Sequence, residues 1–572
     1  MNSLPPELID RISSYLDRDD LKRTLFLSRQ FQEAAERYSG AFKEFTFKDI
    51  NHEPQKLLDA FKPKPKKTDS YTEFLKTYGG RRFRYLRYVE VHTSFPPLRH
   101  SVADPDDFPC RESREELRQK DEMFTKQIKL VFMTIKAVED NVTQAHGPGR
   151  IEVVILTPLR LVDREFCRHR VSSAWRLHLL RPGDLPELAS VRSLSICNPA
   201  EYLEGYNYWR FHQGRFYAFS RLDPRVLIDV ASIFPNLEYL GCQLGVEEGR
   251  LTDQYPTLQH FEHDFEACAR DARHDLAKAL QSTVLPATLR YVQLDFLIEL
   301  DQHVAEERGG GPSLLIGSAR HDMLSTNLRV FTTNLRRLDI RLIADETLFW
   351  SSDMSWPNLE FLSVMFSPTT PSGSWYFRGA SGEGENDVGY EVTDNMYPPL
   401  ETGNARDMPW HNANAHHPSN DYVPKFRSVP NDETIRPFLA AFAEAASTSM
   451  HALKAASLWT NTLEGLAWGI AYAIPGQLAT LYEPPGQDNL PARQLWWRVG
   501  SWRPDSFLHK LFQDIGRAEH GGELIEHWNI DPYGDVLLGR EDFEESLAAF
   551  PRYSGTYPRL SFMKDWYLRR TG

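Results

Sequence analysis

The sequence predicts an α/β protein in which an N-terminal three-helix unit precedes an irregular succession of helices and short strands. Two observations favour this class. The first forty residues carry apolar residues at helical spacing, and a motif of leucine followed by alternating apolar residues returns along the rest of the chain. The chain has 572 residues, 41% of them apolar and 12% aromatic, which is enough to bury a large core.

Three helices are predicted within residues 1–40. Apolar residues recur at helical spacing over 8–16, directly after a pair of prolines that a first helical turn tolerates. An acidic turn at 17–20 ends this run and caps a second helix that begins near Leu21. Ser28 caps a third. Three helices this short bury little surface, so we expect them to pack on a partner or on the rest of the chain.

Longer helices and a repeated motif follow. The helices are predicted over 121–140, 224–233, 265–281, 433–446 and 506–517. Copies of the motif begin at Phe234, Tyr255, Leu285, Thr333 and Trp356, with looser copies at 86–91, 191–196 and 453–458. In most copies a proline before the leucine ends the preceding helix. Helix, proline and strand in succession form the unit of a leucine-rich-repeat solenoid.

The spacing of the motif is uneven. Its key leucines stand at 237, 258, 289, 335 and 359, so the steps vary from 21 to 46 residues. We therefore predict an irregular leucine-rich-repeat-like region over 41–366 rather than a uniform horseshoe.

Residues 367–432 form a polar insertion, rich in Gly, Pro, Ser, Asn and Asp. We expect the segments 374–380 and 389–394 to pair as a hairpin, and 401–420 to be disordered. Residues 433–572 are predicted as a C-terminal repeat or capping region with strands over 465–474 and 493–502.

The composition restricts the cellular compartment and the classes of partner that we expect for this chain. The net charge is −13, which opposes a role in coating DNA or RNA. The five cysteines are scattered and odd in number, which is typical of reduced thiols in an intracellular protein. No apolar run is long enough for a membrane span, and the acidic N-terminus does not resemble a signal peptide. We expect a cytoplasmic or nuclear protein, or one present in both compartments.

The sequence offers no catalytic constellation. It lacks the GxSxG nucleophile elbow and both glycine-rich phosphate-binding motifs. His260, His263, Cys268 and His274 lie close together in the sequence, but the sequence offers no second cluster of ligands that would complete a zinc site. We expect no cofactor, no metal and no enzymatic activity.

The segment LPPELIDRISSYLDRDDLKRTLFLSRQFQEAA resembles an F-box. Leu4, Pro5 and Glu7 match its opening, and Tyr15-Leu16 ends its first helix. An Asp-rich turn before Leu21 and a serine-basic-x-aromatic element at 28–31 follow in the family's order. The rest of the chain is similar to fungal F-box proteins with degenerate leucine-rich repeats. Phe31 stands where many members carry tryptophan.

This resemblance implies a substrate-recruiting subunit of an SCF-type ubiquitin ligase, one that performs no bond chemistry. Its F-box would dock on the Skp-type linker protein, which connects to a cullin, and its repeats would hold a protein target. The residues expected to supply the linker interface and the small internal core together are Leu4, Pro5, Ile9, Ile12, Leu16, Leu21, Leu25 and Phe31.

Two locations are predicted for the target. Arg290, Arg336, Arg337 and Arg341 alternate with apolar residues on predicted strands and would form a basic patch for an acidic or phosphorylated protein. The alternative is that these arginines pair with nearby carboxylates. Tryptophans concentrate in the C-terminal third, where they either fill a core or anchor a partner. We expect Trp496 or Trp497 to be exposed, because neighbours on a strand point to opposite faces.

Two other functions stay open. An F-box scaffold can bind the linker and act outside ubiquitin ligases, and an enzyme with an unrecognised site is also compatible with the sequence.

Overall fold

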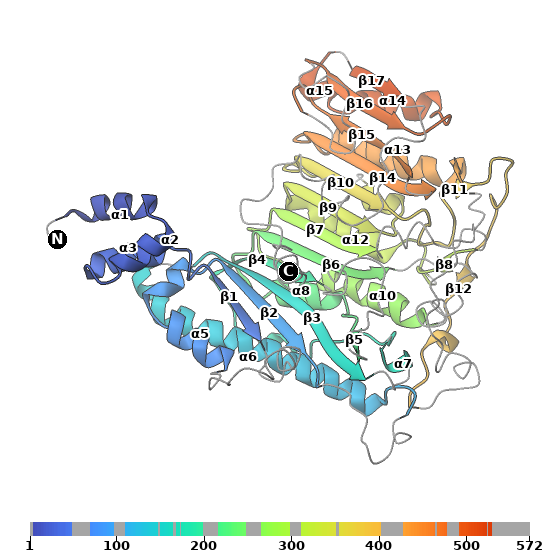
Figure 1. Ribbon diagram of the computed structural model, residues 1–572. Coiled ribbons are helices and arrows are strands. Elements are labelled where there is room, and N and C mark those ends of the chain that lie inside the picture. Colours follow the sequence, from blue (N-terminus) through green and yellow to red (C-terminus); the bar gives the residue numbers. More distant parts are fainter. Residues whose placement is uncertain are drawn as a thin grey trace.

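The centre of the molecule is a large, mostly parallel sheet with helices on one face (Figure 1). The computed structural model describes residues 4–48, 69–96, 109–146, 149–163, 168–171, 173–197, 215–247, 265–297, 311–317, 319–350, 354–401, 427–463, 466–477, 491–522 and 524–528. The α/β class predicted from the sequence is confirmed.

The sheet has thirteen strands. In spatial order they are β1 (Glu44–Lys48), β2 (Tyr88–Ser94), β3 (Ile151–Asp163), β4 (Val191–Cys197), β6 (Tyr239–Glu247), β7 (Tyr291–Leu297), β9 (Arg337–Leu342), β10 (Phe361–Phe366), β14 (Ala455–Leu463), β15 (Leu466–Ala473), β16 (Arg493–Arg498) and β17 (Leu524–Trp528), with β5 (Arg215–Phe219) beside β3. Every pair from β1 to β14 is parallel. Only β5, β14–β15 and β15–β16 introduce antiparallel pairing.

The leucine motif marks where the parallel strands begin. A buried leucine lies two residues before each of six strands: Leu86, Leu237, Leu289, Leu335, Leu359 and Leu453. The motif copies at 86–91, 191–196 and 453–458 also form strands, as do the predicted segments 465–474 and 493–502. The copy that begins at Tyr255 lies outside the described residues.

Helices cover one face of this sheet. Those whose apolar side chains enter the core are α5 (Ser70–Tyr78), α6 (Arg114–His146), α8 (Arg225–Ala231), α10 (Ala267–Ser282), α12 (Met323–Phe331), α13 (Asp432–Thr448) and α14 (Ser506–Asp514). The short α7 (Arg168–Val171) lies near β5, and α15 (Arg517–His520) follows α14. The 3-10 turns are η1 (Arg81–Tyr85), η2 (Pro182–Asp184), η5 (Thr332–Asn334), η6 (Glu346–Phe349) and η7 (Asp394–Met396). The five predicted helices are confirmed; α6 extends beyond 121–140 at both ends. Side-chain caps fix several starts, such as Asp322 on α12 and Asp505 on α14, by accepting hydrogen bonds from free N–H groups.

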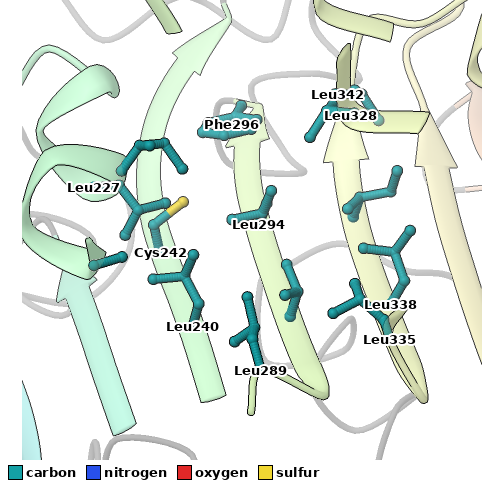
Figure 2. Packing of buried hydrophobic residues seen from close by; sticks show 14 of the residues in the cluster. Leu227, Leu240, Cys242, Leu289, Leu294, Phe296, Leu328, Leu335, Leu338 and Leu342 are labelled. Atoms are coloured by element: carbon teal, nitrogen blue, oxygen red, sulfur yellow. The ribbon is translucent and has the colours of Figure 1, made fainter. Parts of the chain in front are cut away.

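One continuous apolar core joins helices and sheet (Figure 2). Leu240 and Cys242 of β6 and Leu294 of β7 point into it beside Leu227 of α8. The alternate residues of each strand form this face because side chains alternate across a strand.

On its opposite face the sheet carries a row of polar side chains, although parallel sheets are usually apolar on both faces. Gln293, Asp339, Ser363 and Ser457 are neighbours across β7, β9, β10 and β14. All four are buried. The two faces therefore differ in polarity at these four strands, where one is apolar and covered by helices and the other is polar and buried.

The polar insertion packs differently from our prediction. The expected hairpin between 374–380 and 389–394 is wrong. Within the first segment β11 (Phe377–Arg378) pairs with β13 (Val429–Pro430), and within the second β12 (Tyr390–Glu391) pairs with β8 (Ser313–Leu314). Burial explains the difference, because Tyr376 and Phe377 enter the main core. Apart from Glu401, the stretch 401–420 lies outside the described residues.

No helix in the described ranges is long and apolar enough to cross a membrane.

Candidate binding surfaces

Three short helices form the N-terminal unit: α1 (Pro6–Tyr15), α2 (Arg18–Thr24) and α3 (Arg29–Tyr38). Pro5 and Pro6 stand at the start of α1, where a missing N–H costs nothing. The Asp17 carboxylate accepts hydrogen bonds from the N–H groups of Asp19 and Asp20 at the start of α2. Ser28 Oγ accepts one from Phe31 N at the start of α3. The local sequence therefore sets all three starts.

A small core holds these helices together. Ile9, Phe31 and Ala34 are buried against one another, and the partly buried Leu4 packs on them. Leu21 is buried as well. An ion pair between Arg37 and Asp10, 2.6 Å apart, joins α3 to α1.

Large apolar side chains remain exposed on the same unit. Leu8 and Ile12 of α1 are 46% and 43% exposed, Tyr15 is 78% exposed and Phe26 is 92% exposed. Leu25 and Leu27 are also exposed. We name Leu8, Ile12, Tyr15, Leu25, Phe26 and Leu27 the apolar ridge. Exposed apolar groups gathered on one small unit are typical of a protein–protein interface.

The structure divides the eight predicted linker-binding residues between two positions. Ile9, Leu21 and Phe31 are buried inside the unit. Pro5, Ile12 and Leu25 are exposed, and Leu4 and Leu16 are half-buried. The sequence pattern included Ile12 and Leu25 among the candidates but did not single out Leu8, Tyr15, Phe26 and Leu27, which are exposed on the same unit.

Charged contacts fix the unit to the sheet. The buried carboxylate of Glu36 on α3 lies 2.7 Å from Arg82 Nη2 and 3.2 Å from Arg81 Nη2, both on η1. Arg81 Nη1 also lies 2.6 Å from Glu33. Because η1 leads directly into β2, these pairs connect α3 to the start of the sheet (Figure 1).

Two of the predicted target-binding arginines are buried, which corrects the expected basic patch on the strand face. Arg341 is fully buried with Nη1 2.8 Å from Asp295, and Arg337 is 5% exposed with Nε 2.6 Å from Asp339. Charges taken out of water need partners, and the strand spacing places carboxylates beside them. The alternative interpretation, pairing with carboxylates, is confirmed here.

The other two arginines lie at the edge of the sheet. Arg336 is exposed and bonds to Glu360. Arg290 is half-buried, and its Nη1 donates to the carbonyls of Ala287 and Leu289. The four predicted arginines are therefore not one surface.

Trp496 and Trp497 are both buried, so the prediction that one of them is exposed is wrong. Trp497 is fully buried on the helix side and stacks on Trp528 with ring centroids 4.9 Å apart. Trp496, 5% exposed, stacks on His527 on the other face. The two rings do point to opposite faces, but both faces are covered at this position.

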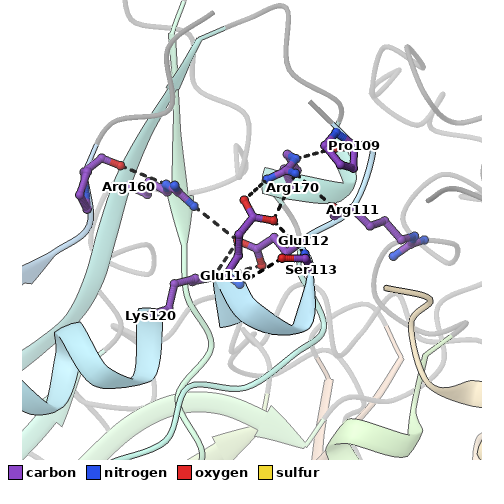
Figure 3. Close-up of polar contacts among 9 residues, drawn as sticks. Pro109, Arg111, Glu112, Ser113, Glu116, Lys120, Arg160 and Arg170 are labelled. Carbon is purple, nitrogen blue, oxygen red and sulfur yellow. Dashed lines mark hydrogen bonds and ion pairs between the residues drawn. The ribbon is translucent and has the colours of Figure 1, made fainter. Parts of the chain in front are cut away.

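A buried ion network joins α6 to β3 and α7 (Figure 3). Arg170 contacts Glu116 at 2.8 Å, and the buried Glu112 lies 3.1 Å from Lys120 and 3.5 Å from Arg160. Burial opposes ionisation of Glu116, but hydrogen bonds from Arg170 and Ser113 N hold the pKa of Glu116 below its usual value. This network cross-links elements far apart in the sequence.

The described residues form no group of three or more His, Cys, Asp or Glu side chains suited to a metal ion. Of the histidine cluster in the sequence, His274 Nε2 lies 2.7 Å from the Leu315 carbonyl, and His260 and His263 lie outside the described residues. Cys110 Sγ lies 3.2 Å from Nδ1 of His169, which is next to Arg170 in the chain.

Comparison with known proteins adds no family. No protein-family model matches the chain, and no curated protein matches its sequence.

Proposed function

We propose that this chain is the non-catalytic substrate-recruiting subunit of an SCF-type ubiquitin ligase. The apolar ridge on α1 and on the turn after α2 binds the Skp-type linker, and the sheet carries the surface for a protein target. The observation that supports this most is the ridge itself. A unit with so small a core leaves Tyr15 and Phe26 exposed, and covering such rings with a partner recovers their hydrophobic free energy.

The domain boundaries of this proposal follow the elements. Residues 1–40 are the F-box: α3 ends at Tyr38, and Gly40 turns the chain with a positive φ of 68° before β1. Residues 41–366 form an irregular leucine-rich-repeat-like solenoid, in which the described copies of the leucine motif each supply one strand, and residues 433–572 are a C-terminal repeat or capping region. Residues 367–432 are an insertion between β10 and α13.

The attachment of α3 to η1 suits a recruiting subunit. Transfer of ubiquitin depends on how often target and loaded enzyme meet, and a rigid link raises their effective concentration. The pairs of Glu36 with Arg81 and Arg82 make the orientation of the linker relative to the sheet definite.

The experiment that tests this proposal is co-purification with the Skp-type linker. We expect the unaltered full-length chain to form a stable complex and the Tyr15→Ala/Phe26→Ala variant to lose it, with a loss of about 2–4 kcal/mol of binding free energy. Phe507→Ala is the matched control, because Phe507 is a similarly exposed ring (64%) on α14, far from the ridge.

Retention of the linker by the double variant would contradict the assigned surface. A scaffold that acts outside ubiquitin ligases would bind the linker equally well. Cullin recruitment and ubiquitin transfer by the reconstituted complex distinguish the two roles.

A further inference from the structure

Positive charge gathers along one edge of the sheet. Because the strands from β1 to β14 are parallel, their N-terminal ends lie at the same edge, where the tails of the arrows stand in Figure 1. A charged residue stands at each of these nine ends. At eight of them it immediately precedes the strand, and at β4 it is the second residue of the strand. These residues are Lys43, Arg87, Arg150, Arg192, Glu238, Arg290, Arg336, Glu360 and Lys454.

Seven of these nine residues are cations, and we name Lys43, Arg87, Arg150, Arg192, Arg290, Arg336 and Lys454 the basic edge. Backbone hydrogen bonds hold the row in register: Arg290 N donates to Glu238 O, Arg336 N to Arg290 O, and Lys454 N to Glu360 O. The edge therefore has a fixed spacing set by the sheet.

Only two carboxylates stand within the row, and each is shared by two cations. Glu238 lies 3.1 Å from Arg150 and 3.8 Å from Arg192. Glu360 bonds to Arg336 and lies 2.7 Å from Lys454. Burial opposes ionisation of Glu360, but the hydrogen bonds from Lys454 and Arg336 lower its pKa.

Three cations of the basic edge have no carboxylate partner among the described residues: Lys43, Arg87 and Arg290. Arg87 and Arg290 fold back in the same way. Arg87 Nη1 donates to the carbonyls of Arg84 and Leu86, and Arg290 Nη1 donates to those of Ala287 and Leu289. Burial and the neighbouring Arg150 charge lower the pKa of Arg87. No carboxylate of the described residues neutralises these two guanidinium groups, so they favour binding of an external anion.

We propose that the basic edge binds an acidic segment of the target protein, running across the strand ends. This inference rests on the proposed function and deepens it by naming the partner's chemistry. Nine strands spaced about 4.8 Å apart extend the row to roughly 38 Å, the length of an extended peptide of about twelve residues. Asp, Glu or phosphorylated side chains of such a peptide meet the guanidinium groups in paired hydrogen bonds.

A protein fits this edge better than a nucleic acid does. Glu238 and Glu360 interrupt the row, so a continuous phosphate backbone would meet two negative charges, and the whole chain carries −13. Nucleic-acid affinity depends on the number of phosphates that clustered Lys and Arg neutralise, and each glutamate in the row lowers it. A peptide can place neutral or basic residues opposite the two glutamates.

The position of the edge suits presentation of a target. The three-helix unit lies on the side of the sheet where the parallel arrows begin (Figure 1). Arg82, which bonds to Glu36 of α3, lies five residues before Arg87. A target on the basic edge is thus held beside the linker-binding unit.

The test measures anisotropy of a labelled Glu-rich peptide of about twelve residues with the full-length chain at physiological salt. The variant is Arg87→Glu/Arg290→Glu, which breaks no ion pair among the described residues. The control is Lys278→Glu/Arg503→Glu, which changes the net charge equally. Arg503 donates to two backbone carbonyls as Arg87 does, and Lys278 is exposed on α10, where it forms a solvent-exposed ion pair with Asp275, 3.0 Å away. We expect the variant to lose at least about tenfold in affinity and the control less than about twofold.

A second variant shifts affinity in the opposite direction. Glu238→Gln releases Arg150 and Arg192 from their shared carboxylate, so the same peptide should bind severalfold more tightly. Equal weakening in the variant and the control, or no tightening with Glu238→Gln, would overturn the proposal. Preferential binding of a labelled single-stranded oligonucleotide, lost in Arg87→Glu/Arg290→Glu, would overturn the choice of partner.

Linker binding separates this inference from the proposed function. The variant Arg87→Glu/Arg290→Glu should keep the linker, because both residues lie outside the apolar ridge. If the unaltered chain binds the acidic peptide but no linker, the proposed function fails. If it binds the linker but not the peptide, the acidic-segment inference fails alone.

Discussion

The three-helix unit and the sheet treat their side chains in opposite ways. The unit buries a few small groups around Ile9 and Phe31 and leaves Phe26 almost fully exposed. The sheet buries even charged groups, such as Arg341 and Asp295. A charge pair buried inside the sheet needs no partner from outside, whereas exposed large rings gain hydrophobic free energy when a partner covers them. The three-helix unit is therefore the region where a partner can gain hydrophobic free energy by covering exposed side chains.

The largest expected effect is a loss of stability when one member of a buried ion pair in the sheet is replaced. Arg341→Met leaves the buried Asp295 carboxylate without its guanidinium partner and should lower the free energy of unfolding by about 3–5 kcal/mol. Chemical denaturation measures the loss. The matched variant Arg341→Met/Asp295→Leu removes both charges and should recover most of it. An equal loss in both variants would show that packing, and not the ion pair, matters at this position.

The same pair gives the effect a pH dependence. Burial raises the pKa of Asp295 to about 6, against the opposing influence of Arg341. A carboxyl with a raised pKa contributes stability that is fully present below its unfolded value, near 3.8, and is lost as the pH rises through about 6. Losing Arg341 raises the pKa further, so the destabilisation by Arg341→Met should be smaller at pH 5 than at pH 8.

Truncating one leucine in each region allows a direct comparison of how much stability each region loses. Leu294→Ala empties part of the core between β7 and the helices and should cost about 2–4 kcal/mol of unfolding free energy. Leu8→Ala removes a half-exposed side chain from the ridge and should cost less than about 0.5 kcal/mol. Thermal unfolding of both variants measures the difference. A comparable loss in Leu8→Ala would mean that the ridge already packs on another part of the chain.

The smallest effect concerns His178, which is half-exposed and lies between two carboxylates of the sheet body. Hydrogen bonding to Asp121 and then to Asp223 raises the pKa of His178 to about 10. Its contribution to stability is therefore fully present below about pH 6.5 and lost as the pH rises through about 10. Because solvent screens the pair, we expect less than about 1 kcal/mol.

Nuclear magnetic resonance of the His178 ring protons measures this pKa. Asp121→Asn should lower the pKa towards the ordinary histidine value, while the distant Asp514→Asn should leave it unchanged. A pKa near 6.5 in the unaltered protein would contradict the proposed clamp between α6 and the segment before α8.

Local patterns made part of the fold predictable. The caps Asp17 and Ser28 were visible because capping depends on residues three positions apart. The leucine motif located the strand starts because Leu237 and Leu289 enter one core. The pairing of β11 with β13 could not be predicted, because Tyr376 and Phe377 are drawn to a core built from distant elements.

The candidate sites were predictable only in outline. Alternation along a strand assigned Arg337 and Arg341 to one face correctly, but it carries no information on what lies beside that face. Exposure of Phe26 and burial of Phe31 depend on how α2 and α3 pack, so the pattern alone could not separate them. The charged residues before each strand become one edge only once the parallel order is known.

The most direct test of the account is hydrogen exchange of the full-length chain with and without the Skp-type linker. Docking over the apolar ridge should slow exchange in α1, in α2 and in the turn that carries Phe26, and leave β6, β7 and β9 unchanged. Slower exchange in the central strands, with α1 and α2 unaffected, would contradict the claim that the exposed apolar unit is the part completed by this partner.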